Sequence, residues 1–496
     1  MRKSILKTVL ISVVTVHTGI IAPAQEQERA SGLVLDMQGA VDYALQNNKN
    51  LMNARQELVK SDKGVWEAIS QGLPQVDAML DYMTYFNYEM EFQFGPDEDF
   101  SFSQEQLNEA SAQTMSTFSG IPEAGINPVT PQDIYNHNAG TYYDGVLQGM
   151  MPPSTILMQD QMTAKIQVGQ LIFSGQYFAG IQTAKLARMI SQQALESTEA
   201  DTKEAVVNAY YLALISESSL AMVERNLDNL RSMLEQTRKM YEAGMAEEID
   251  VDQFSVNVNQ LENTRRSMER NLEMNYNMLR FTLGVPADTE ITLTDDLDAL
   301  FREEEVTDML LKEFNKSGNI NYQILNSQAD ISEKMWDLEK WNYGPTLSGY
   351  YNYNFKLKTT GFDMTPEHLA GFSFNLPLFS SGMRSAKMSQ ARIDYEIAER
   401  NAEILGDQLE LQNSQLKYDL QSSLDNYYTQ KENVEVAERV LESYRIKYRQ
   451  GMASSLEVSQ ANGSYLEAES AFLSAMFEVM NAKIQLQKLM NNLNTL

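Results

Sequence analysis

The side chains best placed for chemistry are four carboxylates within six residues, Glu247, Glu248, Asp250 and Asp252. Acids at the start of a helix are stabilised by the positive end of the helix dipole. The cluster therefore predicts a solvated helix N-terminus. If several chains brought such clusters around one opening, the same carboxylates would attract cations and help to close it. The two interpretations are compatible, and both require a helix that begins at this cluster.

Nothing in the sequence predicts catalysis. The chain has no cysteine, and neither His137 nor His368 has a second histidine nearby. The sequence contains no pattern typical of a serine hydrolase, a zinc protease or a phosphate-binding loop. A group of methionines predicts loop packing rather than a metal–thioether site: Met150, Met151, Met158 and Met162. We therefore expect no enzyme, no catalytic residue, no bound metal and no cofactor.

Composition and the first residues place the protein outside the cytoplasm. The 496-residue chain has a formal net charge of −29, which argues against nucleic acid as a partner, because such proteins need a basic surface. Residues 1–24 carry Arg2, Lys3 and Lys7, then an apolar stretch, then Ala22-Pro23-Ala24. This pattern predicts a cleaved signal peptide. No other run reaches the ~18 consecutive apolar residues of a spanning helix.

One stretch of the chain occurs twice. Met240–Gln253 reads MYEAGMAEEIDVDQ, and Lys447–Gln460, 207 residues later, reads KYRQGMASSLEVSQ. Each copy lies between long segments with coiled-coil spacing. Glycine accepts the left-handed conformation that ends a helix, so Gly244 and Gly451 predict sharp turns between antiparallel helices. Ser454 and Ser455 could cap the helix that follows the second turn.

The segments around these turns are long and helical. In the first copy the pattern runs from about Tyr177 to Tyr241 without proline, and apolar residues recur at spacings of three and four. After the turn the same spacing continues from Val251 to Leu272, interrupted by Arg265, which we interpret as a packing exception or a residue that extends to the surface. Such stripes predict coiled coils. A helix of ~65 residues would be ~100 Å long.

Four other segments alternate between apolar and polar residues, which predicts β-strands. They are Val76–Tyr88, Lys165–Phe173, Thr346–Phe355 and Gly371–Phe379. Residues 92–162, between the first two, have no sustained period and predict an external loop. The offset between the repeats falls from 271 residues, which relates Pro74 to Pro345, to 207 at the turns, so the first copy holds a 64-residue insertion.

The repeats predict the domain organisation. Residues 25–283 form a first structural repeat and residues 319–496 a second, each with a helix, two strands and a long helical hairpin. Residues 284–318 join them and pack beside the helices as an equatorial segment. Smaller expected elements are helices over Leu33–Asn47, Asn50–Gly72 and Asn321–Tyr343, and a short strand over Glu290–Thr294.

Strands of about ten residues with one aromatic-rich face are typical of a transmembrane β-barrel. Four strands cannot close a barrel, since bacterial barrels begin at ~8 strands, and open edges are not tolerated in lipid. The strands must therefore come from several chains around a closed ring. Two copies would supply eight strands, three would supply twelve and four sixteen, and the pattern does not choose among them.

Taken together, these features resemble the TolC-like outer-membrane efflux protein family, over nearly all of the chain after the signal peptide. The most specific motifs are the turns, GMAEEIDV at Gly244–Val251 and GMASSLEV at Gly451–Val458. A second signature is Pro345-Thr346-Leu347 beside Phe379-Ser380-Ser381-Gly382, with a shorter form at Phe173-Ser174-Gly175.

The resemblance implies an α+β membrane protein and a homotrimer of a Gram-negative bacterium. A shared 12-stranded β-barrel would cross the outer-membrane lipid, and a coiled-coil α-barrel would cross the periplasm. An inner-membrane pump would deliver small molecules through a periplasmic adaptor. The adaptor would contact the helical tips at Gly244, Met245, Ala246, Gly451, Met452 and Ala453. The aperture would be lined by Asp250, Asp252, Glu457 and Gln460, with Gln460 standing where the family has a second acid.

Two alternatives stay open on the sequence. A type I secretion duct for polypeptides would have the same fold. A soluble periplasmic coiled-coil scaffold would explain the helices, but it would be expected to carry a compact β-domain and usually one hairpin rather than two. The four strands therefore favour the duct.

Overall fold

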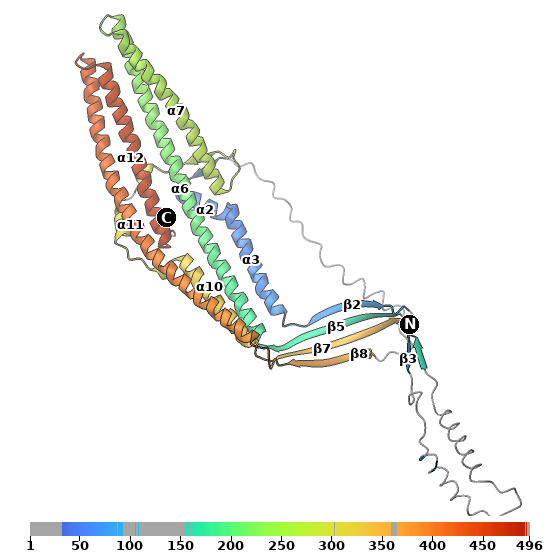
Figure 1. Cartoon of the computed structure of the whole chain (residues 1–496). Helices are drawn as coiled ribbons and strands as arrows, with labels where there is room; N and C mark the ends of the chain where they lie inside the picture. Colours follow the sequence, from blue (N-terminus) through green and yellow to red (C-terminus); the bar gives the residue numbers. More distant parts are fainter. Residues whose placement is uncertain are drawn as a thin grey trace, which may run out of the picture. The chain divides into compact units, whose positions relative to one another are not determined.

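The computed structural model describes residues 32–86, 88–92, 105, 108, 154–157, 160–301, 303–358, 365–491 and 493 (Figure 1). The predicted signal peptide, most of the predicted loop 92–162, His137, Met150, Met151 and Met158 lie outside the described residues. The chain forms two compact units. One is built from the described parts of Met1–Trp66, Ala179–Glu339 and Gly382–Leu496, and the other from those of Glu67–Phe178 and Lys340–Ser381. Both sequence repeats contribute to both units, and the repeat boundaries stay a prediction.

Two long helical hairpins dominate the first unit (Figure 1). In the first hairpin, a tight turn connects helix α6 (Gly175–Glu242) to α7 (Glu248–Leu283). In the second, a tight turn connects α11 (Met383–Arg449) to α12 (Ser455–Leu489). The predicted stripe on α6 is buried where it meets the second hairpin, as at Val223, Leu227 and Leu230. The prediction that this apolar stripe packs against another helix is therefore confirmed.

A second apolar core lies further along these helices and includes the segment that joins the repeats. It contains helix α2 (Met37–Asn47), α9 (Glu303–Leu311) and a parallel pair formed by β1 (Leu33–Leu35) and β6 (Ile291–Leu293). The predicted strand over Glu290–Thr294 is confirmed. The prediction that Leu33–Leu35 is helical is wrong, because β6 supplies a strand partner and the Asp36 side chain caps α2 by accepting from the Gly39 N–H at 2.7 Å.

Two shorter helices flank the long ones. They are α3 (Lys49–Ser70) and α10 (Ile320–Trp341), both close to their predicted bounds. In the first unit, Arg188 of α6 forms an ion pair with Asp62 of α3, and Trp336 of α10 stacks on Tyr395 of α11 with ring centroids 6.2 Å apart. Helix α8 (Leu297–Leu300) and the 3-10 helix η1 (Lys316–Gly318) complete the connection between the repeats.

The second unit contains a four-stranded antiparallel sheet in the order β2-β5-β7-β8. Its strands are β2 (Gln75–Met83), β5 (Gln161–Ser174), β7 (Thr346–Lys358) and β8 (His368–Asn375). All four predicted strands are present. Strand β8 ends before the predicted Phe379, because Pro377 has no N–H to donate to a sheet. Strands β3 (Glu89–Phe92) and β4 (Ser154–Leu157) form a short antiparallel pair that was not predicted. Strand β4 falls within residues 92–162, so the prediction of an irregular loop is wrong there, because β3 supplies a strand partner.

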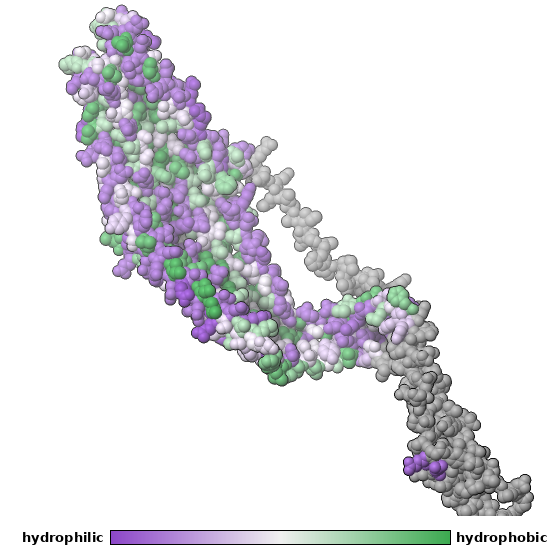
Figure 2. All heavy atoms as spheres, viewed as in Figure 1, coloured by the Kyte–Doolittle hydropathy of each residue, from purple (hydrophilic) through white to green (hydrophobic). Residues whose placement is uncertain are grey.

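The register of the sheet separates apolar from polar side chains. Val76 pairs with Val168, Val168 with Tyr351 and Tyr351 with Ala370, so these residues form one row on one face. The neighbouring row, on the other face, contains Asp77, Gln167 and Asn352 and ends at Leu369 on β8. Because the register aligns the alternating residues of neighbouring strands, the sheet has one mainly apolar face and one mainly polar face. On the side of the helical unit seen in Figure 2, by contrast, hydrophilic side chains predominate and apolar ones are scattered.

Among the described residues, one helix is long and apolar enough to cross a membrane by length and composition. It is α6, and half of its most apolar 18-residue window is buried inside the structure. Burial of this kind is equally typical of a helix in a protein core, so α6 by itself is weak evidence for a spanning helix.

The core between the repeats depends on one buried hydroxyl. Tyr210 donates to Asp295 Oδ2 at 2.9 Å and lies 3.1 Å from the Leu35 carbonyl oxygen. We expect Tyr210→Phe to lower the free energy of unfolding by about 1–3 kcal/mol, because the hydrogen bond to a charged carboxylate would be lost. Asp295 Oδ2 and the Leu35 carbonyl would keep their backbone donors, the N–H groups of Met37 and Thr294. Thermal unfolding in detergent would show this as a lower Tm. Tyr418→Phe, on an exposed tyrosine, is the matched control and should leave the Tm unchanged. Equal effects of the two substitutions would contradict the assignment.

Candidate functional site: the helical tips

The two predicted turns adopt the same conformation. Gly244 has φ +75° and Gly451 has φ +70°, the left-handed region that favours glycine. In each turn the glycine N–H donates to a tyrosine carbonyl, Tyr241 or Tyr448, at 2.9 Å. The N–H of the methionine that follows donates five residues back at 2.8 Å. This is the geometry of a glycine-terminated helix, so the turn conformation predicted from the sequence is confirmed.

Acids at both tips cap the helices that leave the turns. In the second hairpin, Glu457 Oε2 accepts from the backbone N–H of Ser454 at 2.8 Å and from its hydroxyl at 2.9 Å. The Glu457 N–H donates back to Ser454 Oγ at 3.3 Å, which completes a capping box. In the first hairpin, Asp250 Oδ2 accepts from the Glu247 N–H at 3.3 Å. Two of the four predicted aperture residues therefore hold helix N-termini. The other two, Asp252 and Gln460, are exposed.

Two hydrogen bonds made by hydroxyl groups join the hairpins near the tips. Ser455 Oγ donates to Asp250 Oδ1 at 2.5 Å, and the hydroxyls of Thr237 and Tyr448 lie 2.9 Å apart in a buried position. The Tyr448 ring also meets Phe254 edge to face, with centroids 5.6 Å apart. Burial raises the pKa of the Tyr448 phenol. The sequence identified Ser455 only as a possible cap. It did not predict the contact between Thr237 and Tyr448, although a threonine within an apolar stripe indicates that its hydroxyl needs a polar partner.

Further polar contacts continue along the hairpins. Asn257 Nδ2 of α7 donates to Ser459 Oγ of α12 at 2.7 Å. Arg265 interrupts the apolar stripe of α7, and it pairs with Glu262 at 3.2 Å and also with Glu269 on its own helix. This arrangement agrees with its interpretation as a packing exception.

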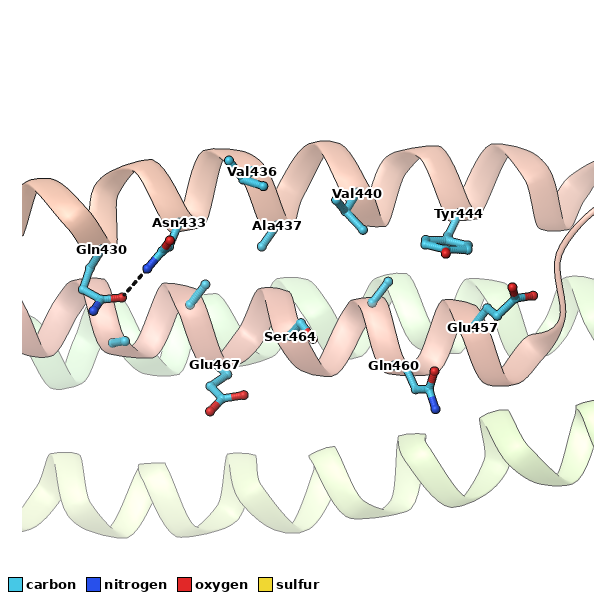
Figure 3. Close-up of a pocket in the computed structure, with 13 residues that line it drawn as sticks. Gln430, Asn433, Val436, Ala437, Val440, Tyr444, Glu457, Gln460, Ser464 and Glu467 are labelled. Carbon is cyan, nitrogen blue, oxygen red and sulfur yellow. Dashed lines mark hydrogen bonds between the residues drawn. The ribbon is translucent and has the colours of Figure 1, made fainter.

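A groove of about 670 Å³ runs between α11 and α12 and ends close to the tip (Figure 3). Glu457 and Gln460 line it together with Tyr444, Val440 and other residues of α11. The structure thus brings two predicted aperture residues to one groove, whereas Asp250 and Asp252 belong to the other hairpin. Around the tips, the described residues include no group of three or more histidine and acidic side chains able to hold a metal ion.

Comparison with known proteins decides the family. The model of the outer membrane efflux protein family matches residues 157–285 and 330–492, which include both turns and strands of both repeats. The chain belongs to this family. It is accordingly an efflux channel component of the outer membrane and not an enzyme.

Relatives in sequence are distant. The outer membrane protein TolC of Vibrio cholerae is 21% identical over 342 residues, covering 68% of this chain and 78% of that protein. The toluene efflux pump outer membrane protein TtgC of Pseudomonas putida is 23% identical over 358 residues, covering 68% and 69%. The antibiotic efflux pump outer membrane protein ArpC of Pseudomonas putida has the same identity and coverage.

Solved channels share the fold over almost the whole chain. CusC superposes with a TM-score of 0.66 at 13% identity, covering 94% of this chain and 95% of that one. VceC of Vibrio cholerae gives 0.61 at 15% identity, covering 91% and 96%. The open state of MtrE of Neisseria gonorrhoeae gives 0.64 at 14% identity, covering 92% and 89%. Long helices with four antiparallel strands per chain are therefore the established fold of this protein.

The left-handed conformation of Gly451 predicts that alanine is destabilising at this position, unlike at a helical glycine. Gly451→Ala should weaken the tip by about 1–2 kcal/mol, because a Cβ is unfavourable at positive φ. Hydrogen exchange of the turn amides would show faster local opening. The matched control is Gly180→Ala in α6, where φ is ordinary and an added Cβ meets nothing within 4 Å. That change should be neutral or stabilising by up to ~1 kcal/mol. A slower-exchanging Gly451→Ala tip would contradict the assignment.

The capping box predicts a response to acid. Hydrogen bonds from the backbone and hydroxyl of Ser454 hold the pKa of Glu457 below its ordinary value of 4.5. The box therefore stabilises the start of α12 above pH 4.5, and this stabilisation is lost as the pH falls through the lower, folded-state pKa. Hydrogen exchange of the first turn of α12, corrected for intrinsic rates, should show this loss.

Glu457→Gln provides the comparison for that experiment. It keeps an acceptor but cannot ionise, so the pH dependence should disappear in this variant. If wild-type protection were the same at pH 7 and pH 3, the capping role of the ionised carboxylate would be wrong.

Proposed function

We propose that the protein works as a homotrimer. Each chain would contribute four strands to a closed 12-stranded barrel in the outer membrane, and its two hairpins to a helical barrel in the periplasm. The trimer would be a passive exit duct for small molecules, delivered by an inner-membrane pump and a periplasmic adaptor.

The open sheet is the observation that carries this proposal. Strands β2 and β8 each have one neighbour in the described sheet, so each leaves a row of backbone N–H and C=O groups unpaired. One face of the same sheet is apolar. Such a sheet can enter lipid only if both edges are paired, which a ring of copies achieves by joining β8 of one chain to β2 of the next. The number three follows from the resemblance to the TolC-like family.

Exposed apolar side chains at the tips support adaptor docking there. Met245 and Met452 follow the turn glycines, and Ile249 and Leu456 occupy equivalent positions one turn later. These four side chains are between 52% and 70% exposed. Apolar groups repeated at both tips favour a protein partner, and they add Ile249 and Leu456 to the predicted contact residues Gly244, Met245, Ala246, Gly451, Met452 and Ala453.

Aperture function rests on the carboxylates that face solvent. Asp252 and Glu457 would attract cations at the end of the duct, with Asp250 held by Ser455 and Gln460 contributing no charge. Opening would require the hairpins to separate near the tips, and therefore the Ser455–Asp250 and Thr237–Tyr448 contacts to break. The names of the Pseudomonas putida relatives, which refer to toluene and antibiotic efflux, support small molecules as the cargo.

Light scattering of the detergent-extracted particle, corrected for bound detergent, tests the proposal. We expect a protein mass of three chains, recovered from the outer-membrane fraction. A reconstituted preparation should also conduct ions across a planar bilayer. A particle of one chain that stays soluble without detergent would overturn the proposal, because four strands cannot close a barrel.

A further inference from the structure

A cleft of about 340 Å³ lies between the two hairpins of one chain. Helices α6 and α7 line it from the first hairpin and α12 lines it from the second. Its volume is at the lower end of the about 300–1,000 Å³ that is typical of sites for small molecules. Asn257 and Ser459, whose hydrogen bond joins the hairpins, both belong to its wall. A molecule in this cleft would therefore contact both hairpins.

Much of the wall of the cleft is apolar. Six side chains of this kind line it: Met222, Val223, Leu230, Leu261, Met268 and Leu466. The first four are buried, and the other two pack against the same cluster. An apolar body that fits the cleft would gain free energy by leaving water for this surface, and the flexible methionines can adapt to its shape.

A glycine within α12 leaves open space on the other wall. Gly463 lines the cleft, and a Cβ added to it would meet nothing within 4 Å. Glycine is less favourable than alanine inside a helix. Neither a close neighbour among the described residues nor a left-handed conformation requires glycine at this position. What the glycine provides is room in the cleft.

The only charged residue that lines the cleft is an acid. Glu467 is exposed, and in Figure 3 its side chain points away from α11. It has no ion-pair partner in the described part of the chain, whereas Glu469, two residues further along α12, pairs with Arg225 at 3.3 Å. The charge of the cleft therefore favours a cation.

A buried acceptor on the same helix lacks a donor. Asn462 is 5% exposed and lines the cleft, and its Oδ1 has no hydrogen-bond partner among the described residues. A buried polar atom without a partner is costly. Because the last torsion of an asparagine side chain is soft, a donor placed in the cleft would give this oxygen a partner.

We propose that the cleft binds a small organic cation that has an apolar body and a protonated amine. The body would lie against the apolar wall of α6 and α7. The ammonium group, which has donors and no acceptor, would face the acceptors on α12, Glu467 and Asn462. A neutral molecule of the same shape would lack the attraction to Glu467, and an anion would be repelled.

Binding in this cleft would stabilise the contact between the hairpins, because the molecule touches both. In the proposed duct, the bound cation would therefore oppose the separation of the hairpins that opening requires. This consequence rests on the proposed function, whereas the binding site itself requires only one chain.

Equilibrium dialysis with phenethylamine tests the proposal. The full chain in detergent is dialysed at low ionic strength against the same detergent, so that micelles are present on both sides. We expect saturable binding of one molecule per chain. Gly463→Leu should abolish this binding, because the leucine side chain would occupy the cleft. Glu467→Gln should weaken it by about two- to fivefold, as expected for the loss of an exposed charge pair.

Three comparisons complete the experiment. Glu469→Gln is the matched control, since it removes a carboxylate from α12 outside the cleft and should bind phenethylamine as the wild type does. Phenethyl alcohol, which has the same shape without the charge, should bind more weakly to the wild type and equally to Glu467→Gln. If Gly463→Leu does not fold, Gly463→Ala tests the same space: it should raise the Tm and weaken binding.

The outcomes separate the possible occupants. The absence of saturable phenethylamine binding would mean that the cleft holds only water, and would overturn the proposal. Equal binding by the wild type and the folded Gly463 variants would overturn it as well. Equal affinity for the amine and the alcohol would overturn the assignment to a cation. Binding is measured per chain, so a particle of one chain would overturn the proposed trimer without changing this result.

Discussion

Backbone pairing at the edges of the sheet is the constraint on which the rest of the structure depends. An N–H or C=O group without a partner costs several kcal/mol in hydrocarbon, where water cannot replace it. The sheet of β2, β5, β7 and β8 has an apolar face and two open edges. A single chain cannot satisfy both conditions in a membrane. In the proposed trimer, strand pairing between copies would resolve the conflict, and the helical hairpins would have to fit the same ring.

The internal repeat gives one chain two helical hairpins of the same design. Two hairpins of the same design lie side by side and contact each other near their tips. This contact contains the buried Thr237–Tyr448 pair and the Ser455–Asp250 bond. The second hairpin has alanines, Ala437, Ala461 and Ala468, where the first has Leu230, Phe254 and Leu261. Repetition with altered side chains therefore gives two hairpins of the same design whose equivalent residues differ in size and chemistry.

Acidic residues at the tips illustrate how one side chain can serve structure and function. Glu457 accepts from Ser454 and holds the start of α12, while it also lines the groove. Glu457 is exposed, so in the proposed duct its charge would remain available to attract cations at an aperture. Asp250 is different, because its carboxylate is engaged by Ser455 of the other hairpin. The two acids occupy equivalent positions in the repeat and are not equivalent in chemistry.

The sequence by itself determined the features that depend on local pattern. Coiled-coil spacing predicted the long helices, the glycines at 244 and 451 predicted the turns, and alternation predicted all four strands of the sheet. Each of these signals is carried by neighbouring residues, since helix and strand periodicity and glycine's access to positive φ are properties of short segments.

Tertiary structure alone decided the features that depend on distant partners. Leu33–Leu35 is a strand because β6 lies beside it, and the strand order β2-β5-β7-β8 shows which edges are open. The pairing of Thr237 with Tyr448 joins residues that no local pattern connects. The groove on α11 and α12 likewise exists only once two helices lie side by side. These features arise from the three-dimensional packing of segments whose local sequence is compatible with several partners.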